Sequence, residues 1–160
     1  MFRMTRECKD YFNALTDEGR VHKVKKLSIQ FDGYYLCLLV GLYQAKLDAK
    51  AVFDGTLVDY YPGDYPESCE YIAGLLIAAE IKRIPIDSGN ADEVEKLMSK
   101  LIDAQSKTRL SEEGFKLLNQ YAARGFEIMR ENLAGAHTTL EWFYDDYFTC
   151  FENGAFDVDN

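Results

Sequence analysis

The chain has 160 residues, the length of one ordinary globular domain. Hydrophobic residues make up 48% and charged residues 28%, with 3 prolines and 11 glycines, which excludes a disordered, collagen-like or low-complexity chain. The formal net charge of −9 argues against broad electrostatic attraction to nucleic acid or to an anionic membrane. The charge is also uneven, because residues 1–50 carry a net +3 and residues 51–160 a net −12.

The first thirty residues predict a short helix and a basic segment. Apolar residues recur at helical spacing from Cys8 to Leu15, behind Thr5 as an N-cap, which predicts a helix over 5–15. Residues 20–26 are basic, and residues 27–31 alternate between apolar and polar as in a short strand.

Two later segments predict helices with almost no polar face. The first begins at Asp32 and runs to about residue 50. The second opens at a capping box formed by Asp64 and Glu67 and ends at Lys82 and Arg83, before Pro85. A helix that is apolar all round lies at the centre of a bundle, or meets a partner along one side. We therefore expect two central apolar helices.

Three amphipathic helices follow, and each has an N-terminal cap. They open at Asn90, Ser111 and Thr138, and glutamates three residues after Asn90 and Thr138 complete capping boxes. In the last helix, apolar residues at helical spacing form one stripe: Leu140, Phe143, Tyr144, Tyr147, Phe148 and Phe151. The whole pattern predicts one all-α domain of about six helices over residues 1–152, with one short strand near 27–31 and a mobile acidic tail over 153–160.

The acidic C-terminal end is the main indication of function. From His137 onward there are six acids, seven aromatic residues and no Lys or Arg. We interpret the chain as a non-enzymatic adaptor or accessory subunit, whose partner is a larger protein with a basic surface. The residues expected to contact it here are Trp142, Asp145, Asp146 and Glu152. The acidic half would also suit the basic groove of a DNA-binding protein, and the surplus apolar surface would suit a homodimer.

A tyrosine-rich turn is a second candidate contact surface. Tyr60, Tyr61 and Tyr65 surround a Pro-Gly pair, and loop tyrosines supply rigid, amphipathic contact area. The alternative is that these side chains fold back over the two apolar helices. The sequence leaves both interpretations open.

One alternative function is enzymatic. The segment from Arg130 to His137 has the form Arg, six residues, His, and resembles the motif of HEPN ribonucleases, small all-α domains that cleave RNA as dimers without metal. The resemblance implies that Arg130 stabilises phosphate charge while His137 assists attack by a ribose 2′-hydroxyl.

Another alternative is direct DNA binding. The basic segment, the alternating residues after it and the following helix resemble the start of a ribbon-helix-helix protein, whose paired strands enter the major groove. The resemblance implies DNA contacts from Lys23, Lys25, Lys26 and Ser28.

Other classes of site find no support in the sequence. The four cysteines are widely spaced without a CxxC pair or a histidine cluster, so we expect reduced core thiols and no metal. There is no glycine-rich phosphate loop or other cofactor motif, and we expect no cofactor. The charged N-terminal residues and the short apolar runs predict neither a secretory leader nor a membrane span, hence a cytoplasmic protein.

Overall fold

The computed structural model describes residues 1–13, 15, 30–63, 65–87, 89–133, 135, 137 and 139–157. Within them the chain is helical, which confirms the all-α prediction. The described helices are α1 (Arg6–Asn13), α2 (Gln30–Gln44), α3 (Cys69–Arg83), α4 (Ala91–Leu101), α5 (Glu112–Asn132) and α6 (Leu140–Glu152). A 3₁₀ turn over Tyr65–Ser68 leads into α3. None of these helices combines the length and the apolar character that crossing a bilayer requires.

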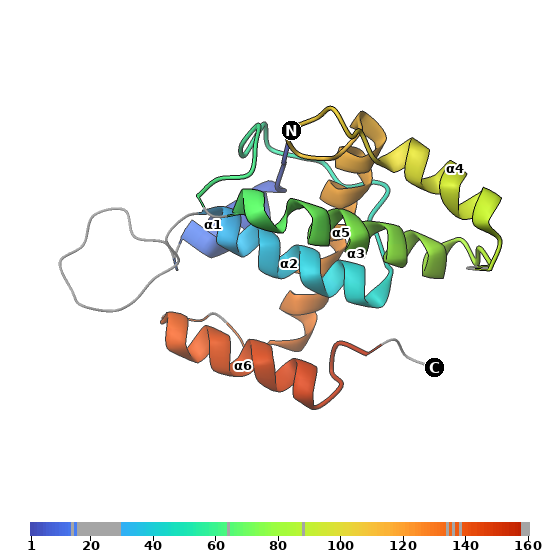
Figure 1. Ribbon diagram of the computed structural model, residues 1–160. Helices are drawn as coiled ribbons and strands as arrows, with labels where there is room; N and C mark the ends of the chain where they lie inside the picture. Colours follow the sequence, from blue (N-terminus) through green and yellow to red (C-terminus); the bar gives the residue numbers. More distant parts are fainter. Residues whose placement is uncertain are drawn as a thin grey trace.

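Helices α2 and α5 form the centre of the fold (Figure 1). They approach closely because Gly41 of α2 and Gly125 of α5 lie where the two backbones meet. A side chain at Gly125 would overlap the carbonyl oxygen of Cys37, and one at Gly41 would overlap that of Tyr121. Two glycines therefore set the separation of the central helix pair.

Helix α3 lies beside α2 and is buried along one side only. Ile72, Leu76 and Ala79 are buried, whereas Tyr71 and Leu75 are exposed. Its sequence is apolar on both sides, so an apolar face remains uncovered by the described residues. Of the two helices expected at the centre, α2 lies there, whereas α3 lies at the side of the fold and keeps an exposed apolar face.

Helix α6 packs below this group through aromatic side chains (Figure 1). Phe143 and Tyr147 are fully buried, and the Tyr147 hydroxyl donates a hydrogen bond to the carbonyl oxygen of Leu36 at 2.9 Å. Residues 153–157 follow α6 and return to α2, where the side chain of Gln44 donates to the carbonyl of Phe156 at 2.9 Å. The division between a helical domain and a mobile tail stays a prediction.

Several helix ends confirm the predicted caps. The side chains of Asn90 and Ser111 accept hydrogen bonds from the backbone N–H groups of Glu93 and Gly114. The cap of α6 differs from the prediction by one residue: it is Thr139, whose side chain accepts from the backbone N–H of Trp142. The predicted capping residues Thr138 and Asp64 lie outside the described residues.

Helix α2 has different limits from the predicted ones. It begins before Asp32, at Gln30, and it ends at Gln44 because Ala45 adopts a positive φ of 53°. Of the expected strand over 27–31, Gln30 and Phe31 belong to this helix, while residues 27–29 lie outside the described residues.

Candidate functional site

The outer side of α6 presents acidic and aromatic side chains together. Its exposed positions include the residues that we call the acidic aromatic face: Glu141, Trp142, Asp145, Phe148 and Glu152. Trp142 is 43% exposed and Phe148 is 56% exposed, which is high for large aromatic side chains. Helix α6 contains no Lys or Arg, so its own sequence neutralises none of these carboxylates.

Trp142, Asp145 and Glu152 were predicted from the sequence and lie on this face. The sequence places Phe148 on one apolar stripe with Tyr147, and the structure divides that stripe. Tyr147 fills the buried position, whereas Phe148 stacks on Tyr144 at a ring-centroid distance of 6.0 Å and remains exposed. Phe148 is thus a surface residue that the periodicity alone did not separate from its buried neighbours.

Asp146 was also predicted to contact a partner protein, but its carboxylate is bonded to a residue of this chain. Its carboxylate lies 2.8 Å from Nε2 of His137, and the side chain of His137 is fully buried. The other ring nitrogen, Nδ1, lies 2.9 Å from the hydroxyl of Tyr11 on α1. Asp146 therefore belongs to a Tyr11–His137–Asp146 network that connects the first helix with the last.

The surroundings of Tyr11 determine its protonation. Burial, with smaller contributions from the Cys37 thiol and the Asp146 carboxylate, raises the pKa of Tyr11 to about 12. Tyr11 therefore keeps its proton at neutral pH and can donate it to Nδ1 of His137.

Arg130 and His137, the pair from the HEPN-like motif, have different surroundings. Arg130 is exposed and forms an ion pair with Glu7 at 2.7 Å. Gly135, between the two residues, adopts a positive φ of 87° after α5 has ended. With both ring nitrogens engaged and no exposed side-chain surface, His137 holds α1 and α6 together in this conformation; the ribonuclease interpretation stays a prediction.

The tyrosine-rich turn divides between surface and core. Tyr60 is 63% exposed, with the Lys107 ammonium 5.7 Å from its ring centroid. Tyr61 is buried, and burial raises the pKa of its hydroxyl. Tyr65 is half-buried and donates to the Asp32 carboxylate at 2.9 Å. Two of the three tyrosines therefore fold back toward the helices.

The residues of the DNA-binding interpretation cannot be placed in the same way. Lys23, Lys25, Lys26 and Ser28 lie outside the described residues.

Glu80 is a buried charged residue on α3 that the sequence analysis did not predict. Glu80 accepts hydrogen bonds from the hydroxyl of Tyr121 at 2.6 Å and from the guanidinium of Arg83 at 2.6 and 2.7 Å. Burial acts to raise the pKa of Glu80, but the hydrogen bonds from Arg83 and Tyr121 outweigh it and hold the pKa below its ordinary value. The ionised carboxylate thus connects α3 to α5.

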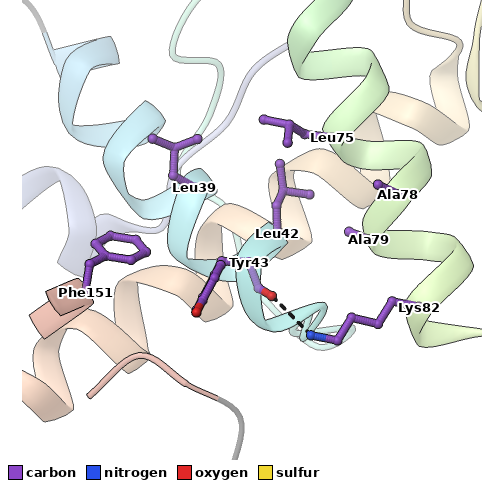
Figure 2. Close-up of a pocket in the computed structure, with 8 residues that line it drawn as sticks. All are labelled: Leu39, Leu42, Tyr43, Leu75, Ala78, Ala79, Lys82 and Phe151. Carbon is purple, nitrogen blue, oxygen red and sulfur yellow. Dashed lines mark hydrogen bonds between the residues drawn. The ribbon is translucent and has the colours of Figure 1, made fainter. Parts of the chain in front are cut away.

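An apolar groove lies between α2 and α3, and Phe151 of α6 closes one end (Figure 2). Its volume is about 400 Å³, and its lining is Leu39, Leu42, Tyr43, Leu75, Ala78, Ala79, Lys82 and Phe151. The ammonium of Lys82 reaches the carbonyl oxygen of Tyr43 at 3.5 Å. The sequence predicted two highly apolar helices here, but it did not show which of their apolar residues line a groove.

The described residues contain no cluster of His, Cys, Asp and Glu suited to a metal ion. Among the described cysteines, Cys8, Cys37 and Cys150 are buried, Cys69 is half-buried, and none of the four forms a disulfide. Comparisons with the models of protein families, with curated proteins and with solved structures found no match.

Proposed function

We propose that this chain is a non-enzymatic protein-interaction module, an accessory subunit that binds a basic surface of a larger protein. The observation that supports this proposal is the acidic aromatic face of α6. Exposed Trp142 and Phe148 lie there among three carboxylates, on a helix without a single basic residue. A few residues supply most of the binding energy at protein interfaces, and aromatic residues are enriched among them, while surrounding charges help to select the partner.

The chemistry of the face defines the partner. Apolar rings gain free energy when they enter a pocket, and the carboxylates of Glu141, Asp145 and Glu152 attract Lys and Arg around it. Because α6 has 13 residues, the face is about 20 Å long, the size of the central part of an ordinary interface. A basic groove that otherwise holds nucleic acid has the matching charge, and we propose such a groove as the surface that is masked.

A pair of matched variants tests this proposal by co-purification from the native host. Asp145→Lys with Glu152→Lys reverses two exposed charges of the face and leaves the Tyr11–His137–Asp146 network intact. Asp92→Lys with Glu95→Lys makes the same change in net charge at exposed positions of α4. We expect the α6 variant to lose a basic partner that the wild type and the α4 variant both retain.

Two further observations make the test specific. Binding should weaken as salt concentration rises, because salt screens the electrostatic attraction between the carboxylates and a basic surface. Phe148→Ser should also release the partner without a change in net charge. If the α6 charge variant keeps its partner as fully as the wild type does, this face is not the binding surface.

A further inference from the structure

The exposed side of α3 is an apolar surface separate from the acidic aromatic face. Tyr71, Gly74, Leu75, Ala78 and Lys82 are all exposed and follow the helical spacing i, i+3, i+4, i+7 and i+11. We call these five residues the outer face of α3. Tyr71 is 76% exposed and Leu75 is 43% exposed. Such a continuous exposed apolar stripe is typical of an interface.

The outer face has a different shape at its two ends. Its first half carries the large side chains of Tyr71 and Leu75. Its second half carries the small side chain of Ala78. The apolar groove, which Leu75 and Ala78 both line, lies beside it, and Leu39 and Leu42 of α2 line the other side (Figure 2). Tyr71 thus projects from the beginning of this face, one or two turns before Leu75 and Ala78, which line the groove.

The charges on α3 show the same division. Glu67, in the 3₁₀ turn before α3, and Glu70, at the beginning of α3, are exposed, whereas Lys82 and Arg83 are exposed at its end. If two copies of α3 lie antiparallel, the acidic end of each meets the basic end of the other. A two-fold axis near residues 76 and 77 places Leu75 opposite Ala78 of the second copy, and Tyr71 opposite its Lys82.

We propose that the outer face of α3 is a dimer interface, with a second copy of this chain as its occupant. Each copy inserts Leu75 and Tyr71 toward the small residues and the groove of the other, and each brings Glu70 close to Lys82 of the other. The same antiparallel arrangement places large side chains opposite small ones and acidic residues close to basic ones. This surface shares no residue with the acidic aromatic face, so the inference does not depend on the proposed function.

The size of this contact sets the expected affinity. From Glu70 to Arg83 the helix is about 20 Å long, so a pair of such helices buries less surface than the roughly 1,200 Å² of a small stable interface. The dimer should therefore dissociate on dilution, with a Kd on the order of micromolar to tens of micromolar.

Sedimentation velocity across a dilution series tests the dimer directly. From about 5 to about 500 μM, we expect the mass of the wild type to rise from 18.3 kDa toward twice that value. Leu75→Glu should remain monomeric, because it places a charge in the apolar contact. Met98→Glu is the matched control, since Met98 is 44% exposed on α4, and it should dimerise like the wild type.

Charge reversal tests the antiparallel arrangement. Lys82 is chosen over Arg83, which is bonded to the buried Glu80. Glu70→Lys and Lys82→Glu should each weaken dimerisation about tenfold, because like charges then meet at both ends. Mixed in equal amounts, the two variants should form a heterodimer about as strong as the wild-type dimer, because every contact is again between opposite charges.

Three results would overturn the proposal. They are a wild type that stays monomeric over the whole concentration range, a Leu75→Glu variant that still dimerises, and a mixture of charge variants that recovers no dimer. Circular dichroism confirms that each variant is folded. Glu70 also forms an ion pair with Arg109 of its own copy. Mixing the two variants cannot restore that ion pair, so a dimer that returns on mixing shows that the contact between copies had been lost.

Discussion

The Gly41–Gly125 contact between α2 and α5 makes a quantitative prediction about stability. In Gly125→Ala, the new methyl group would overlap the carbonyl oxygen of Cys37 and lie 2.7 Å from the backbone nitrogen of Gly41. Both neighbours are backbone atoms, so the two helices must separate by about 1 Å to relieve the overlap. If about 50 atom pairs lose half of about 0.15 kcal/mol each, the cost is about 4 kcal/mol.

Alanine also has a better helix propensity than glycine by about 1 kcal/mol, so the net loss of unfolding free energy is about 3 kcal/mol. At about 2–4 °C per kcal/mol for a chain of this size, Tm should fall by about 6–12 °C. Thermal unfolding followed by circular dichroism measures this change, and urea unfolding provides the free energy.

Gly74→Ala is the matched control for Gly125→Ala. Gly74 is also within a helix, but a methyl group there would have no neighbour within 4 Å. We expect a gain of about 1 kcal/mol and a rise in Tm of about 2–4 °C, measured at low protein concentration. If Gly125→Ala is as stable as the wild type, the two central helices are not in the close contact described here.

Three further predictions concern the buried polar groups. The pKa of Glu80 is lower in the folded state, so its stabilising effect is present above its ordinary pKa and is lost as the pH falls through the folded-state pKa. Tyr121→Phe removes a hydrogen bond to Glu80 and should lower the free energy of unfolding by about 1.5–3 kcal/mol at pH 7. In urea unfolding at acid pH, the difference in stability between this variant and the wild type should become smaller. His137→Ala should cost about 3 kcal/mol, since it leaves Tyr11 and Asp146 without their partner, and a variant as stable as the wild type would contradict this role. Tyr61→Phe should raise the free energy of unfolding by about 1 kcal/mol, because the buried Tyr61 hydroxyl has no hydrogen-bond partner among the described residues. Tyr60→Phe should leave stability unchanged, because Tyr60 is exposed. Equal changes in Tm for the two variants would contradict the difference in burial between Tyr60 and Tyr61.

Local signals in the sequence were sufficient for the helices and several of their ends. Asn90 and Ser111 cap helices in the predicted way, because a cap depends on residues three positions apart. Leu118, Phe126 and Met129 likewise follow the apolar periodicity of α5, and all three are buried. These features are set within one or two helical turns, and the sequence contains all the information that they need.

Features that depend on contacts between distant residues were not predictable. On α3 nearly every position is apolar, so the periodicity could not show which side faces α2. Glu80 with Arg83 three residues later is typical of a surface ion pair, and its burial depends on Tyr121, which is 41 residues away. In the same way, Asp146 was expected at the surface, but it bonds to His137, and His137 in turn bonds to Tyr11 at the other end of the chain.

The most direct test of the proposed function is photocrosslinking in the native host. Phe148, 56% exposed at the centre of the acidic aromatic face, is replaced by p-benzoylphenylalanine, and Met98, 44% exposed on α4, receives the same replacement as a control. If the face binds a partner, irradiation should join the chain at position 148 to one larger protein through a basic region, with no such adduct from position 98. An absent adduct at position 148, or the same adduct from both positions, would contradict the proposal.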